Sequence, residues 1–310
     1  MCALGAVSSA SAALLVNESF SDYIDGSDIH GQLALGSGLA GNWNSTVSGS
    51  PASSAAISAG LTFGAMSVSG GAVTVSVPGA PSSGVTARYL GLGVNTSSSI
   101  GTVTGTLYSS FLYQTGGGYQ PTNHAIHGRV SSAIGGLNAQ GRFFVNPDNT
   151  TGATAAAPYY SGTPPTINSG QSALTVGTTY LAIGRFTNVG STGGVGTMLT
   201  LTEAQYTDWI TNQGGDEAAL FARSQGTGAG QVAVSLNTSV SGDVATFVGG
   251  SNTFIQTFTS SGNSASSTAF SVTYDELRYT TSFAELSLVP EPSSLALVSL
   301  AALGLIRRRR

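Results

Sequence analysis

Short apolar runs, separated by Gly, Ser, Asn and Pro, recur along most of the chain and constrain its fold more than any other feature. Several of these runs alternate apolar and polar residues, which is typical of half-buried antiparallel strands. We predict strands at residues 66–77, 86–94, 103–115, 125–134, 141–145, 178–186, 196–202, 231–236, 243–248, 252–258 and 268–279. Strands of this number and spacing predict an all-β fold, a two-sheet antiparallel sandwich of jelly-roll type. No fixed-period repeat is visible, which argues against a solenoid or a propeller.

One or two short helices are expected to interrupt the strands. In TEAQYTDWITNQGG, Thr202 is a candidate N-cap, and Tyr206, Trp209 and Ile210 share one face. The pair Gly214-Gly215 would end this helix, and DEAALFARS at 216–224 would add a second short turn. The loop 146–171 has no pattern and is a place where a binding surface could sit.

Charge excludes one class of function. Charged residues make up 8% of the chain, and all ten basic residues are arginines. Four of them are the last four residues, so the rest of the chain has six arginines against thirteen acidic residues that precede Glu291. A negatively charged body without a basic stripe repels phosphate backbones, so nucleic acid is not an expected partner.

Both ends of the chain predict export. Residues 1–13 are small and apolar and contain Ala10-Ser11-Ala12, the form of a signal-peptidase site, so we interpret them as a residual signal peptide. The alternative is an ordinary N-terminal strand. Near the other end, Pro290-Glu291-Pro292 precedes fourteen uncharged residues, 293–306, which form a single apolar helix of about 21 Å. Four arginines follow it and would stay on the cytoplasmic side, which leaves the body outside. The alternatives are an ordinary membrane anchor or a helix buried in the body.

The C-terminal sequence is similar to the PEP-CTERM sorting signal of Gram-negative bacteria. The matching residues are Val289, Pro290, Glu291, Pro292, Arg307, Arg308, Arg309 and Arg310. This resemblance implies transient anchoring in the inner membrane and recognition by exosortase, a membrane-embedded protease. It also implies cleavage near the two prolines and a final location at the cell surface or in the extracellular polysaccharide matrix. The expected division is therefore a leader at 1–13, a body at 14–288 and a sorting signal at 289–310.

The body resembles bacterial concanavalin A/laminin-G-like domains. At its start, residues 18–44 contain Gly36, Gly38, Gly41 and Trp43 in a G-x-G-x-x-G-x-W-like arrangement. The segment 87–115 resembles the next paired strands, and 271–286, with Asp275, Glu276, Leu277 and Arg278, resembles the closing strand. The resemblance implies that the first and last strands lie side by side. It also implies that Asp275 and Arg278 form a structural pair.

No arrangement of residues predicts catalysis. Retaining glycoside hydrolysis needs two carboxylates about 5–5.5 Å apart. If extended, the neighbours Asp216-Glu217 and Asp275-Glu276 would each point to opposite faces, and Glu203 and Asp208 belong to the predicted helix as surface residues. His124 and His127 lack a third ligand near them in sequence, because His30 is remote.

One loop is a candidate for calcium. Asp22, Asp25 and Asp28 surround Gly26, and lectin-like sandwiches hold calcium in oxygen-rich loops. The alternative is that these residues only form Asx-turns. No other cofactor or metal is expected.

These observations favour an exported, surface- or matrix-associated protein that is not an enzyme. The resemblance to lectin-like domains alone implies glycan binding by the body. The alternatives are a polysaccharide-active glycoside hydrolase and a purely structural matrix protein.

Overall fold

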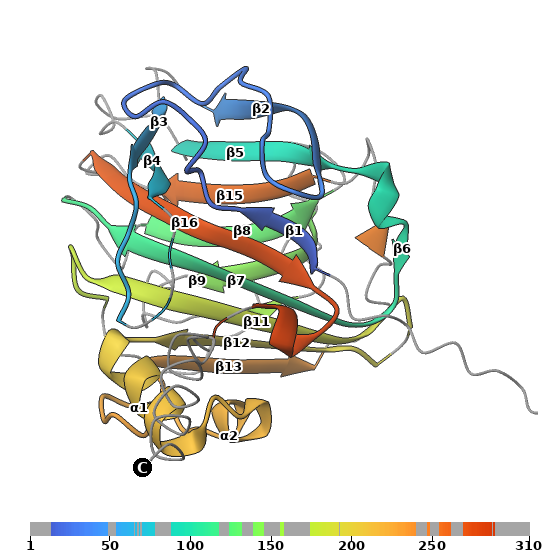
Figure 1. Cartoon of the computed structure of the whole chain (residues 1–310), viewed down its shortest axis with the longest axis vertical. Helices are drawn as coiled ribbons and strands as arrows, with labels where there is room; N and C mark the ends of the chain where they lie inside the picture. The colour runs from blue at the N-terminus through green and yellow to red at the C-terminus, as the bar shows by residue number, and fades with distance from the viewer. Residues whose placement is uncertain are drawn as a thin grey trace, which may run out of the picture.

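Two antiparallel sheets stacked face to face make up the body, as Figure 1 shows. The computed structural model describes residues 14–48, 54–64, 66, 68, 70–77, 88–117, 124–131, 139–145, 156–157, 174–191, 193–239, 247–248, 254–261, 269–286 and 288. The predicted leader 1–13, the sorting signal 289–310 with its apolar helix, and most of the loop 146–171 lie outside these residues. The division into leader, body and sorting signal therefore stays a prediction.

Within the described residues, one sheet has eight strands. Seven follow the order β13-β12-β11-β7-β16-β4-β3, and β1 pairs with β16. In chain order they are β1 (Leu14–Glu18), β3 (Ser54–Ala59), β4 (Gly71–Val77), β7 (Gly105–Thr115), β11 (Thr179–Val189), β12 (Val195–Leu201), β13 (Val234–Ser239) and β16 (Phe270–Thr280). The pairing of β1 with β16 confirms that the first and last strands are neighbours.

The second sheet has six described strands in the order β10-β9-β8-β15-β5-β2. They are β2 (Leu39–Ser48), β5 (Arg88–Thr96), β8 (His124–Ser131), β9 (Ala139–Val145), β10 (Ala156–Ala157) and β15 (Phe254–Ser261). A small ribbon joins β6 (Thr102–Val103) to β14 (Phe247–Val248). The predicted all-β sandwich is confirmed.

The main core lies between the two sheets. Tyr113 and Tyr274 point into it from the eight-stranded sheet, and Trp43, Leu92 and Val94 from the six-stranded sheet. All five side chains are fully buried. Burial of a large apolar side chain contributes about 1.5–3 kcal/mol to the free energy of unfolding. This core therefore stabilises the packing of the two sheets against each other.

A second apolar cluster covers the outer face of the eight-stranded sheet. Leu112, Ile183 and Leu199 form its floor, and Tyr206 and Trp209 pack onto them from α1 (Glu203–Gln213). We call α1, the following α2 (Glu217–Phe221) and the 3-10 helix η2 (Phe283–Leu286) the helical cap. A further 3-10 helix, η1 (Ser98–Ile100), follows β5. In the part of the chain that the structure describes, no helix has the length and hydropathy that a membrane span requires.

The two predicted helices are confirmed, and the capping residues explain why they form. The Thr202 hydroxyl accepts a hydrogen bond from the Gln205 backbone N–H at 3.3 Å. The Gln205 side chain accepts one from the Thr202 N–H at 3.1 Å, which completes a capping box. Gly214, at φ 61°, ends α1 in the left-handed conformation, and Asp216 caps α2 through the Ala219 N–H.

Candidate functional site

The described body ends at a residue that is firmly held. Leu288 is 2% exposed and packs in the cluster of the helical cap. Its carbonyl accepts a hydrogen bond of 2.6 Å from the Tyr206 hydroxyl, and the carbonyl of Leu286 accepts one of 2.6 Å from Arg278. Burial raises the pKa of Tyr206 to about 12, so its hydroxyl remains a donor at neutral pH. Leu288 precedes Val289, the first residue of the predicted sorting signal.

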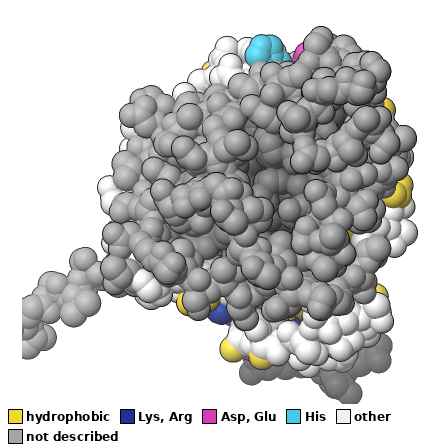
Figure 2. Space-filling model, turned by 180° about the vertical axis from the view of Figure 1, so that it is seen from behind, with side chains coloured by type: hydrophobic (Ala, Val, Ile, Leu, Met, Phe, Trp, Pro, Cys, Tyr) yellow, Lys and Arg dark blue, Asp and Glu magenta, His cyan; other side chains and the backbone are white. Residues whose placement is uncertain are grey.

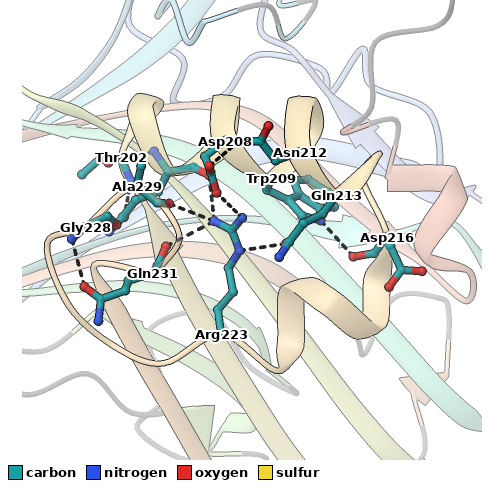
Figure 3. Close-up of polar contacts among 11 residues, drawn as sticks. Thr202, Asp208, Trp209, Asn212, Gln213, Asp216, Arg223, Gly228, Ala229 and Gln231 are labelled. Carbon is teal, nitrogen blue, oxygen red and sulfur yellow. Dashed lines mark hydrogen bonds and ion pairs between the residues drawn. The ribbon is translucent and has the colours of Figure 1, made fainter.

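A buried arginine holds the segment after α2 against α1 (Figure 3). The Arg223 guanidinium donates to Asp208 Oδ2 at 2.6 Å, to Gln213 Oε1 at 3.0 Å and to the carbonyls of Gln205 and Ala229 at 3.0 Å each. The hydrogen bond from Asn212, and then that from Arg223, lower the pKa of Asp208. Because its charge and its donors are satisfied within the cap, Arg223 stabilises the cap and is not available to a ligand.

A hollow of about 550 Å³ opens in the cap beside Leu288. Its wall combines aromatic, hydroxyl and carboxylate groups: Tyr108, Gly215, Glu217, Thr281, Ser282, Phe283, Ala284 and Leu288. Glu217 Oε1 accepts hydrogen bonds from the Tyr108 hydroxyl at 2.8 Å and from Arg185 at 3.2 Å. Burial, and then this bond to Glu217, raise the pKa of Tyr108 to about 12. The hollow therefore offers an oriented carboxylate beside aromatic rings.

The predicted calcium loop lies at the opposite end of the molecule. Asp22, Asp25 and Asp28 are exposed on the segment between β1 and β2, and Asp28 Oδ1 accepts the backbone N–H of His30 at 2.9 Å. Figure 2 shows histidine and acidic side chains together at this end, away from the cap. Among the residues that the structure describes, no three His, Cys, Asp or Glu side chains are grouped to hold a metal ion. The hydrogen bond from the His30 N–H to Asp28 is that of an Asx-turn, which is the alternative interpretation of this loop. Calcium binding here stays a prediction.

Beneath this loop a buried carboxylate fixes the first strand. Glu18 is 3% exposed, and it accepts hydrogen bonds from the Phe20 N–H, the Gly36 N–H and the Tyr23 hydroxyl. Trp43 donates in turn to the Tyr23 oxygen at 2.9 Å. Burial raises the pKa of both acids, that of Tyr23 to about 12. No sequence signal pointed to Glu18, because its partners meet only in the folded loop.

The glycine motif serves close packing in this same network. A Cβ at Gly36 would lie 2.5 Å from the Asn17 carbonyl oxygen, and one at Gly38 would lie 1.7 Å from that of Leu15. Gly38 also has φ +73°, which disfavours other residues. The motif that suggested a lectin-like domain is therefore a structural feature, which lets the loop cross β1 at contact distance.

The acidic residues of β16 differ from the prediction. Glu276 has φ 52°, and the pairing with β7 shifts register between Asp275 and Arg278, so the strand has a bulge here. Asp275 accepts the Leu61 N–H at 2.9 Å, and Glu276 forms the ion pair with Arg278. The predicted pair of Asp275 with Arg278 is therefore wrong, because the acid that pairs with Arg278 is Glu276.

The bulge also decides where the two carboxylates point. Asp275 and Glu276 both contact groups on the cap side of the sheet, whereas the next residue, Leu277, points into the interior core. The prediction of opposite faces is wrong, because the extra residue of a bulge breaks the alternation of a regular strand. Asp275 is fully buried, and this burial, together with the charge of Glu276, raises its pKa to about 8.

The remaining candidates lie apart from one another. Glu203 is exposed on α1, as expected for a surface residue. His124 and His127 belong to β8, where the description does not extend to side chains. The sorting residues Val289, Pro290, Glu291, Pro292 and Arg307 to Arg310 lie outside the described residues.

Comparison with known families identifies the C-terminal segment. Residues 288–310 match the PEP-CTERM protein-sorting motif, which confirms the predicted sorting signal and implies export and sorting to the cell envelope. No curated protein matches the chain.

Solved structures of several carbohydrate-related proteins are similar to the body at low identity. Endo-β-1,4-glucuronan lyase from the fungus Trichoderma reesei is 8% identical, with a TM-score of 0.45 over 78% of this chain and 92% of its own. Alginate lyase Aly36B is 13% identical, with a TM-score of 0.40 over 86% and 96%. Lectin UEA-II in complex with galactose is 10% identical, with a TM-score of 0.33 over 76% and 92%. At these values the similarity says nothing about what this chain binds or does.

Proposed function

We propose that the chain is an exported envelope protein that exosortase cleaves near Pro290-Glu291-Pro292. Residues 293–306 anchor it transiently in the inner membrane, and the body then reaches the cell surface or the extracellular matrix. The observation that supports this proposal is the sorting motif at residues 288–310. The uncharged segment followed by four arginines supports the orientation, since arginines are retained on the cytoplasmic side.

The test follows the tagged full chain in two matched bacterial strains, one with exosortase and one without it. We expect loss of the C-terminal segment only in the strain with exosortase, and persistence of the full chain in the membrane fraction of the other. The variant Glu291→Ala should behave as if exosortase were missing, and Ser294→Ala is the matched control that should be processed normally. Equal processing in both strains would refute the proposal.

For the body we propose glycan binding without catalysis. The hollow supports it, because Glu217 can accept hydrogen bonds from sugar hydroxyls while aromatic rings such as Phe283 pack on the apolar face of a sugar. The buried carboxylates support the absence of catalysis, since Asp275 and Glu276 serve hydrogen bonds within the fold.

A glycan array with the purified body, in calcium and in chelator, tests this second proposal. Binding that weakens in Glu217→Gln but not in Glu203→Gln, an exposed acid of the same cap, is the expected result. Release of products from a polysaccharide would favour the hydrolase. Absence of binding to every glycan on the array would favour the structural matrix protein.

A further inference from the structure

Leu288 determines how far the body can lie from the apolar segment 293–306. This residue is held by its burial and by the hydrogen bond from Tyr206, so the described body is fixed as far as Leu288. Only residues 289–292 separate it from Ser293, the first residue of the uncharged segment. Even fully extended, this tether spans at most about 17 Å from Leu288 to Ser293.

The membrane takes up part of that length. The fourteen uncharged residues give a helix of about 21 Å, shorter than a hydrocarbon core of about 30 Å. Such a mismatch pulls the ends of the helix inward or thins the bilayer. The headgroup layer then occupies about 5–7 Å of the tether, which leaves roughly 10 Å outside the membrane.

The body is far larger than this gap. A compact domain of about 275 residues has a radius of gyration near 19 Å, which corresponds to a width of roughly 50 Å. The body therefore cannot turn a distant surface toward the membrane without carrying Leu288 beyond the reach of its tether. The surface around Leu288 has to be the surface that lies nearest to the lipid.

We infer that, while the chain is anchored as proposed above, the helical cap faces the membrane surface and the β2 edge of the six-stranded sheet lies farthest from it. Leu288 packs with Tyr206 and Trp209 of α1 on the outer face of the eight-stranded sheet. Figure 1 shows α1 and α2 at one end of the long axis and β2, the edge strand of the six-stranded sheet, at the other. The hollow beside Leu288 is then shielded in the anchored chain and opens to solvent on release.

The charge of the cap indicates that the tether alone holds it there. The helices α1, α2 and η2 contain four acids and no basic residue; Asp208 and Glu217 are paired with Arg223 and Arg185, whereas Glu203 and Glu285 add negative charge to this surface. Anionic lipid headgroups repel such a surface. Cleavage of the tether therefore leaves nothing that retains the cap at the membrane, so the body separates fully.

Cysteine accessibility in the full chain tests this orientation. Cys2, the one native cysteine, is changed to Ser, and a single cysteine is introduced by Thr211→Cys on α1 or by Asn44→Cys on β2, both at exposed positions. Spheroplasts of the strain without exosortase are treated with a bulky polyethylene-glycol maleimide. A matched pair of chains adds about twenty Gly and Ser residues between Leu288 and Val289, which lengthens the tether by about 25 Å.

We expect Thr211→Cys to react roughly tenfold more slowly than Asn44→Cys in the short-tether chain, and to approach its rate in the long-tether chain. In detergent the two positions should react equally. Equal rates in the anchored short-tether chain would overturn the orientation. A chain found outside the membrane fraction would instead refute the anchoring under "Proposed function", so the two failures are distinguishable.

Discussion

The buried carboxyl of Asp275 should make the body less stable as pH rises through neutrality. In the folded body its pKa is about 8, whereas the ordinary value is 3.8. Burial is the main cause, and the charge of Glu276 adds to it, while the N–H groups of Leu61 and Glu276 and the charge of Arg278 partly offset the shift. Between these two pKa values the folded state keeps a proton that the unfolded state has lost.

The sign and the size of the effect follow from proton linkage. Because the folded state binds more protons, the free energy of unfolding falls as pH rises from about 4 to about 8. The full slope is about 1.4 kcal/mol per pH unit, so Asp275 alone removes about 2.7 kcal/mol between pH 5 and pH 7. Domains are typically stable by only about 5–15 kcal/mol, so this loss is large enough to measure. Burial raises the pKa of Glu18 as well, which acts in the same direction.

Urea unfolding of the body at pH 5, 6 and 7 measures this slope. The variant Asp275→Asn mimics the protonated acid, since its amide oxygen can still accept the Leu61 N–H. Its stability relative to the wild type should therefore rise by about 2.7 kcal/mol from pH 5 to pH 7. The control Glu203→Gln, at an exposed acid of α1, should follow the wild type at every pH. Parallel curves for Asp275→Asn and the wild type would refute the reasoning.

Three further predictions concern other parts of the body. Arg223→Met should cost about 1–3 kcal/mol in urea unfolding, because the carbonyls of Gln205 and Ala229 lose their buried donor; Asp208→Asn should cost less, because Asp208 is partly exposed, and equal losses would contradict this account. Gly38→Ala should abolish the folded state by circular dichroism, whereas Gly26→Ala, also at positive φ but with open space around it, should cost only about 1–2 kcal/mol. If the loop at 22–28 binds calcium, the ion should raise the melting temperature of the wild type but not of Asp25→Asn, and no shift in the wild type would rule calcium out.

Local patterns in the sequence predicted most elements of the fold. Alternation located most of the long strands but missed β2 (Leu39–Ser48) and β3 (Ser54–Ala59). The helix at 203–213 was predicted by its cap Thr202 and its terminal Gly214, because capping depends on neighbouring residues. The strand predicted at 66–77 is shorter in the structure, at Gly71–Val77. The residues before it pack on the outer face of the sheet instead, where Phe63 and Met66 join the cap cluster. Tertiary contacts determine where such a strand begins, and the alternation of apolar and polar residues does not reveal these contacts.

The candidate site was harder to predict because its groups meet through packing. Glu217 was weighed as one of two adjacent carboxylates, yet its position depends on Tyr108 and Arg185, which come from distant strands. Long-range contacts of this kind decide both the orientation and the pKa of an acid. The bulge at Glu276 does have a local sequence signal that the prediction did not use: the apolar positions are Val272 and Tyr274 and then Leu277 and Tyr279, so the alternation shifts by one residue.

The two ends of the body explain how processing at each terminus can leave the fold intact. The strand β1 begins at Leu14, two residues after the predicted leader site at Ala10-Ser11-Ala12, and pairs with β16 from that residue onward. At the other end Leu288, the first residue of the matched sorting motif, completes the cap cluster. The described core therefore takes its outermost contacts from residues that lie just inside both processing sites. If the chain is cleaved near Pro290-Glu291-Pro292 as proposed, and loses the predicted leader 1–13, none of the described hydrogen bonds would break, so the body can keep its fold before and after release.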